Sequence, residues 1–129
     1  MNYADPLAQV RNCLLNDAAV AAIVSGRVAV EQQDRPPEYP CILIALRSPG
    51  KSDLSHAHRR LTVNLRYYSA VNASAVLALQ AAAETALRAA YDEGTLFPIT
   101  YIEPETPMPI PADGGWGLSQ NISAIAKEV

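Results

Sequence analysis

The chain has 129 residues and a formal net charge of −3, and 50% of its residues are hydrophobic. This is the length of one ordinary domain, and it is enough to bury a core without disulfides or metals. The slightly acidic balance argues against a general nucleic-acid binder, which carries a basic surplus. Much of the apolar content is alanine, which buries little area per residue, so we expect an isolated subunit of modest stability.

The cysteines and the apolar runs indicate the compartment. Cys13 and Cys41 lie far apart within apolar stretches, and two cysteines without a secretion signal do not make a disulfide framework. The N-terminus lacks the positive charge of a signal peptide, and the longest apolar run, residues 18–24, is about a third of a membrane span. These features predict two buried thiols, a cytoplasmic protein or one released from the cytoplasm, and no membrane partner.

The first element is expected to be a helix followed by a helical turn. Asp5 is placed to cap the helix, and Pro6 suits its first turn. Asp17 then caps a short alanine-rich helical segment that Gly26 ends. The apolar residues of the first helix share one face: Leu7, Val10, Leu14 and Leu15.

Three strands are expected next. Residues 27–30 form a short strand, and a polar loop with three prolines follows. Residues 41–46 are six apolar residues in a row, which indicates a well-buried strand. Residues 60–69 alternate between apolar and polar, which predicts a strand with one face in solvent.

The main helix has clear start and stop signals. Asn72 or Ser74 caps it, and Gly94 closes it after about 20 residues, or ~30 Å. Small side chains along its apolar stripe allow it to lie close to a sheet. The stripe consists of Val76, Leu79, Gln80, Ala83, Ala86, Leu87 and Ala90.

The last third of the chain is expected to be extended. Residues 96–103 form a strand in which Pro98 favours an edge position or a strand start. Four prolines within residues 104–111 predict an extended, non-helical arm. Residues 113–115 form a turn, and residues 117–127 alternate as a final strand.

The order of elements therefore predicts an α+β fold, namely a single, mainly antiparallel β-sheet with two main helices packed on one face. Helical crossovers between strands are too few for a doubly wound parallel sheet. We expect one domain over residues 1–129, with the Pro-rich arm at about 104–111.

A metal site can be imagined at His56 and His58, with Asp53 near. A stable site needs three or four ligands, and the neighbouring sequence offers no further cysteine or histidine. We expect a solvated loop here, with no metal and no cofactor.

Four of the ten Lys/Arg residues surround one loop: Arg47, Lys51, Arg59 and Arg60. A nucleic-acid site would want aromatic residues among these charges. Two interpretations stay open, a solvated loop that keeps a sheet edge soluble and a patch that meets an acidic protein surface.

The sequence contains no motif that asks for catalysis. The glycine-rich turn at residues 113–117 lacks a Gly-Lys-Ser/Thr ending and leads into a strand, so a tight turn with Trp116 packed over it is expected instead. Ser119 has no nucleophile-elbow context, and Asp92-Glu93 lie at a helix end where exposure is the rule. We expect a protein that is not an enzyme.

The order of features resembles a known family. The opening "DPLAQVRNCLLNDAAVAAIVSGRV" is followed by "YPCILIAL", "RRLTVNLRYYS" and an alanine-rich helix. This order, over about residues 3 to 92, is similar to the small tail-completion or tail-terminator proteins of long-tailed bacteriophages and their relatives in the neck of the virion. The segment 104–111 has no counterpart in this resemblance.

The resemblance implies a virion structural protein, a subunit of a closed ring, commonly a hexamer, that completes the tail and joins it to the head. Its partners would be itself, the tail-tube protein and a neck or head-completion protein. DNA could pass through the ring, but no sequence-specific nucleic-acid binding is implied. From exposure and composition, independently of the family, we expect interface residues in the loop and the arm: Arg47, Lys51, His58, Arg59, Arg60, Met108 and Ile110.

Three alternatives remain. The chain could be another neck or head-closure connector, or a small non-viral adaptor that binds a peptide or metabolite in a groove. It could also be an enzyme whose site forms between subunits, with His56, His58 and Asp53 meeting partners across an interface.

Overall fold

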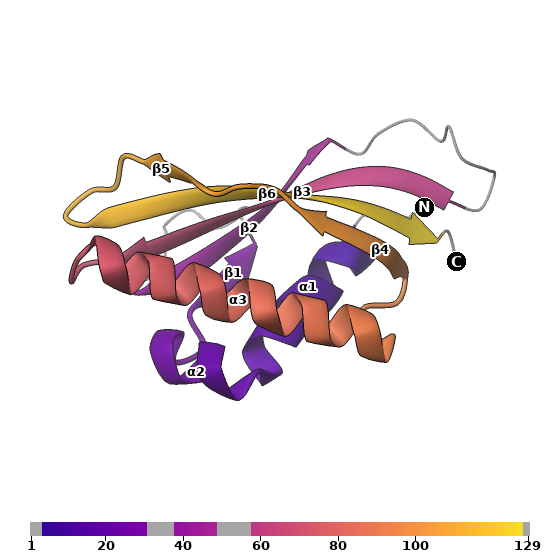
Figure 1. The fold of residues 1–129 in the computed structure, drawn as a ribbon, viewed down its shortest axis with the longest axis horizontal. Coiled ribbons are helices and arrows are strands. Elements are labelled where there is room, and N and C mark those ends of the chain that lie inside the picture. The colour runs from indigo at the N-terminus through magenta and orange to yellow at the C-terminus, as the bar shows by residue number, and fades with distance from the viewer. Residues whose placement is uncertain (1–3, 31–37, 49–57, 128–129) are drawn as a thin grey trace.

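The computed structural model describes residues 4–30, 38–48 and 58–127. Three helices and six strands form one α+β unit, and the helices lie together on one side of a single twisted sheet (Figure 1). None of these helices is long and apolar enough to cross a membrane. The elements are α1 (Ala4–Asn16), α2 (Ala18–Val24), β1 (Val28–Val30), β2 (Cys41–Ser48), β3 (His58–Ser69), α3 (Ala73–Glu93), β4 (Ile99–Pro104), β5 (Met108–Ile110) and β6 (Trp116–Lys127).

The strand order in the sheet is β1-β2-β3-β6-β4, and β5 also pairs with β6. Only β1 and β2 are parallel, and every other pair is antiparallel. The long pair β3–β6 runs without a register shift from His58↔Lys127 to Ser69↔Trp116. The predicted fold class is therefore confirmed, with one strand, β5, beyond those expected.

The main core lies between the sheet and the helices. The apolar stripe of α3 packs on β3, β4 and β6, while α1 packs on β1 and β2. Small residues at the contact, such as Ala83 and Ala86, let α3 lie close to the strands. The largest fully buried side chains include Leu14, Ile42, Ile44, Leu61, Leu65, Tyr67, Leu79, Leu87, Leu96 and Gln120.

The predicted helix signals are mostly confirmed. The side chain of Asp17 accepts a hydrogen bond from the Val20 N–H at 3.0 Å, and that of Asn72 accepts one from Ala75 N–H at 2.8 Å. Gly94 ends α3 with a φ of 76°, a left-handed conformation that glycine adopts without a steric penalty. One expectation was wrong, because α1 begins at Ala4 and Asp5 lies within its first turn.

The segment 104–111 is extended, as expected, but it lies along the sheet. Its first residue ends β4, and β5 follows after a short gap, so both strands line the same side of β6. The Glu105 N–H donates to the Asn121 carbonyl at 2.9 Å within that gap. The prolines therefore lie in a broken edge strand along β6 (Figure 1).

Candidate subunit interface

Exposed large apolar side chains gather at one end of the molecule, where β3 ends and β6 begins. Trp116 opens β6 opposite Ser69 and is 45% exposed. Val71, 70% exposed, follows Ser69 closely, and its N–H donates to the Ser69 hydroxyl at 3.2 Å. Leu77, near the start of α3, is also exposed. We call Val71, Leu77 and Trp116 the Trp116 end. Packing of Trp116 over the turn at 113–115 therefore stays a prediction.

A second group lies at the opposite end, where α3 gives way to β4. Phe97 is 49% exposed and Tyr101 is 41% exposed. The ring of Tyr101 meets that of Tyr91 edge to face, with centroids 6.2 Å apart. The Lys127 N–H donates to the Pro98 carbonyl at 2.7 Å, which fixes this group beside the last residues of β6. We call Phe97 and Tyr101 the Phe97 end.

The two ends are separated by the length of α3. This helix has 21 residues, so it spans ~30 Å at 1.5 Å per residue. Figure 1 shows α3 running beneath β6 from the turn before β6 to the start of β4. Two unlike exposed apolar groups therefore lie at opposite ends of one subunit.

The basic residues expected at an interface lie at the Phe97 end. His58 opens β3 opposite Lys127, and Arg59 and Arg60 follow it. Arg60 and Lys127 are exposed, while His58 and Arg59 are partly buried. The structure therefore brings the described part of the basic cluster beside an exposed apolar group.

Of the two remaining basic residues of that cluster, Arg47 lies within the described part of the chain and Lys51 does not. Arg47, on β2, is exposed and donates to the Asn64 side-chain oxygen at 3.4 Å. Lys51 lies outside the described residues, as do His56 and Asp53, so the imagined histidine site stays a hypothesis. Within residues 4–30, 38–48 and 58–127, no group of three potential metal ligands comes together.

The two residues expected in the proline segment differ from each other. Met108 is 67% exposed, as an interface residue would be. Ile110 instead packs into a small apolar cluster on the face of the sheet opposite the helices, which we call the far face. That cluster includes Ala29, Cys41, Leu43 and Tyr68, with Tyr39 and Ala112 beside them. Ile110 therefore has less side chain to offer a neighbouring copy.

The far face is less solvated than the alternation of β3 predicts. Tyr68 is 8% exposed and stacks on Tyr39, with ring centroids 5.2 Å apart. Asn64 is 3% exposed, and its side-chain N–H groups donate to the Ser119 hydroxyl at 2.8 Å and to the Asn121 side-chain oxygen at 3.0 Å. The expectation of one wet face was thus wrong for these two positions, because cross-strand partners on β6 and the 38–40 segment cover them.

A buried polar network on the helix side escaped prediction. Gln120, fully buried, accepts a hydrogen bond from the Tyr67 hydroxyl at 2.9 Å. Its side-chain nitrogen donates to the Glu84 carboxylate at 2.7 Å and to the Glu105 carbonyl at 2.9 Å. Gln80 adds a longer bond to Gln120 at 3.3 Å. The polar Gln80 within the α3 stripe was the one signal of this network in the sequence.

The Tyr67 hydroxyl in this network stays protonated at neutral pH. Burial raises the pKa of Tyr67 above its usual value, and the neighbouring Glu84 charge raises it further. Because the network also binds the Glu105 carbonyl, it ties α3, β3, β6 and the segment between β4 and β5 together. All of these hydrogen bonds join groups of the same subunit, as is typical of a network that stabilises the fold.

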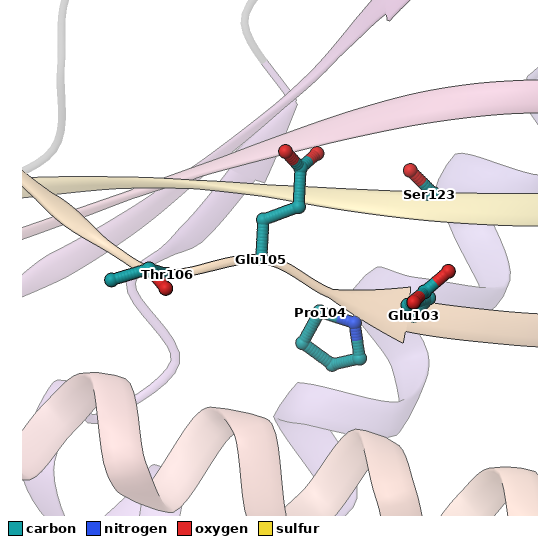
Figure 2. A pocket seen from close by; sticks show the side chains of 5 residues that line it. All are labelled: Glu103, Pro104, Glu105, Thr106 and Ser123. Atoms are coloured by element: carbon teal, nitrogen blue, oxygen red, sulfur yellow. The ribbon is translucent and has the colours of Figure 1, made fainter.

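A first surface hollow lies beside the segment between β4 and β5. It has a volume of about 570 Å³ and is lined by Pro104 and four polar residues, Glu103, Glu105, Thr106 and Ser123. Figure 2 shows the side chains of Glu105, in the segment after β4, and of Ser123, on β6, pointing to the same side of the sheet. A cation bound here would find carboxylates only from Glu103 and Glu105 among the lining residues, fewer ligands than a metal site needs.

A second hollow, of about 400 Å³, lies between α1 and α3 and contains Cys13. Burial, with help from the Asp17 and Glu93 charges, raises the pKa of this thiol to about 11. The thiolate is the nucleophile, so Cys13 is a weak one at neutral pH. Both Cys13 and Cys41 are free thiols, as expected, although Cys13 is only half-buried.

Comparison with known proteins adds no assignment, since no family model and no curated protein matches the chain. The functional interpretation therefore depends on the surfaces described above and on the resemblance carried by the sequence.

Proposed function

We propose that the chain is a structural subunit of a bacteriophage virion, one copy of a ring that completes the tail tube and joins it to the head. The observation that carries this proposal is the pair of unlike exposed apolar groups, one at the Trp116 end and one at the Phe97 end. Contiguous exposed apolar surface commonly marks a contact with another protein.

Opposed, unlike contact surfaces favour head-to-tail association. A two-fold dimer buries the same surface on both subunits, whereas a heterologous contact joins two different surfaces and leaves one of each free. Repetition of that contact closes into a ring when the rotation returns to its start. A ring subunit needs this arrangement, and an ordinary two-fold dimer does not.

The chemistry of the described residues also supports a structural role. The buried polar side chains Gln120 and Asn64 make their hydrogen bonds within the subunit. The thiol in the α1–α3 hollow is held protonated. The order of sequence features resembling tail-completion proteins then supplies the virion, the tail tube and the neck as the setting.

The mass of the native protein in solution tests this proposal. We expect purified protein to form a ring-sized species by light scattering, alone or once tail tubes of the encoding virus are added. Electron microscopy of those tails should show the protein at the tube end that faces the head. A protein that stays monomeric and never joins purified tails would remove the proposal.

A small adaptor that binds a peptide or metabolite is the second candidate. The hollow between α1 and α3, lined by residues including Gln9, Asn12 and Glu93, is the observation that favours it. A thermal-shift screen separates the two candidates, because a ligand that binds only the native state raises the melting temperature. Stabilisation by one ligand class, without ring formation, would favour the adaptor.

A further inference from the structure

Both edges of the sheet lack some of the backbone groups that an added strand would use. At the β1 edge, the Val28 N–H donates to the Gly26 carbonyl at 2.9 Å, and the Val28 carbonyl accepts from the Arg11 side chain at 3.0 Å. These are backbone groups that an incoming strand would need. With only three residues, β1 is also too short to template a long pairing.

The opposite edge is closed by prolines. The Lys127 N–H donates to the Pro98 carbonyl and the Asn121 carbonyl accepts from Glu105, so the odd-numbered residues of β6 direct their backbone groups to this edge. Pro104 lies opposite the even-numbered Ile122, and therefore has its backbone nitrogen on the outer side. Proline has no N–H to donate there.

The same argument applies further along that edge. Pro109 lies opposite the even-numbered Leu118, between Met108 and Ile110. Its outward position again removes a donor that strand addition would use. Prolines and irregular pairing are common devices by which natural sheets protect an edge. Contacts between copies must then be made by side chains.

The exposed side chains at the two ends are complementary on both sides of the sheet, the side covered by the helices and the far face. In the layer of the helices, the exposed apolar Val71 and Trp116 lie at one end and the exposed Phe97 lies at the other. The layer of the far face is charged. It carries Arg60 and Lys127 beside the Phe97 end.

Exposed acidic residues occupy the far face at the other end. Glu38 adjoins Tyr39, whose ring stacks on Tyr68 next to the end of β3. Asp113 precedes Trp116 by three residues and lies close enough to Tyr39 to affect the pKa of its hydroxyl. Asp92 and Glu93 close α3 at the Phe97 end and are exposed in the helix layer, where they can remain solvated at a rim.

We infer that a second copy of this chain docks end to end, the Trp116 end of one copy against the Phe97 end of the next, with Glu38 and Asp113 of the first copy facing Arg60 and Lys127 of the second. The inference rests on the proposed function and specifies the contact within it. No strand pairs across this interface. Apolar burial supplies the affinity, and the opposite charges fix the orientation of the two copies.

Mixing two damaged copies tests this inference. Trp116→Ser and Phe97→Ser each remove one apolar anchor, and each variant alone should self-associate at least about tenfold more weakly than the native chain. Mixed in equal amounts, they should form a heterodimer by light scattering, because each retains one intact end, but no larger ring. Ala81→Ser, on the exposed side of α3 about midway between the two ends, should leave the ring intact.

Charge reversal gives an independent test, because it does not depend on whether the Trp116→Ser and Phe97→Ser variants fold correctly. Arg60→Glu should weaken the ring, and adding Asp113→Lys to the same chain should restore it. Rings that survive Trp116→Ser, Phe97→Ser and Arg60→Glu would overturn the inference while leaving the proposed function standing. A native chain that forms no ring, with or without tail tubes, would overturn both.

Discussion

On the helix-covered face of the sheet, β3 and β6 present mainly large apolar side chains, interrupted by one polar network around Gln120. On the far face the same strands present Asn64, Ser119 and Asn121 in the middle, and an apolar cluster around Tyr68 towards one end. Both faces contain buried residues, but only the first is sealed by helices. The difference indicates that most of the apolar burial that stabilises the fold lies on the helix side.

Truncation of a core leucine should separate the two faces most strongly. Leu65 is fully buried on the helix side of β3, and its replacement by alanine should lower the free energy of unfolding by about 3 kcal/mol. Leu43→Ala, on the far face of β2 and 8% exposed, should cost clearly less because solvent and side chains can fill the space. Urea unfolding measures both, and equal losses would contradict the assignment of the core to the helix side.

Loss of the polar network should have the next largest effect. Gln120→Leu leaves the Tyr67 hydroxyl and the Glu105 carbonyl without their partner, which should cost about 2 kcal/mol. Asn64→Leu on the far face should cost about 1 kcal/mol, since its partner Asn121 is exposed and can turn to water. A Gln120 variant as stable as the native chain would show that the network does not fix β6 against α3.

Alkaline pH should act on the helix side through Tyr67. Its pKa is raised in the folded chain by burial and by Glu84, so the unfolded state releases this proton first as the pH rises. The stabilising contribution is complete below the unfolded value of about 10, and stability then falls by up to about 1.4 kcal/mol per pH unit. Tyr67→Phe should flatten the pH profile of unfolding, and an unchanged profile would point to another group.

Thiol labelling should give the smallest difference between the faces. Burial raises the pKa of both cysteines to about 11, so each should react roughly a hundredfold more slowly than a free thiol near pH 8. Cys13 is half-buried and should label before Cys41, which the far-face cluster buries fully. Faster labelling of Cys41 would show that this cluster opens locally.

Local signals in the sequence predicted much of the fold. The caps at Asp17 and Asn72, the Gly94 stop and the alternation of β3 depend on residues a few positions apart, and a single sequence carries that information. The role of the proline segment could not be predicted in the same way. Proline excludes helix, but only the tertiary register shows whether an extended segment projects or pairs.

The candidate interface was predicted only in part. The basic residues near His58 were recognised by composition, and the structure places the described ones at the Phe97 end. Trp116 and Val71 were not recognised, because their proximity comes from the pairing of Trp116 with Ser69 across 47 positions of sequence. The network at Gln120 joins residues from α3, β3 and β6, and it has no local pattern for the same reason.

The end-to-end contact can be tested directly by cross-linking between two copies. Chains carrying Asp113→Cys are mixed with chains carrying Arg60→Cys and treated with a short thiol-reactive cross-linker. We expect a covalent dimer only when both variants are present, at a yield well above that of either variant alone or of the native chain. A dimer of Asp113→Cys chains with one another, or no dimer in the mixture while rings still form, would contradict head-to-tail assembly through these ends.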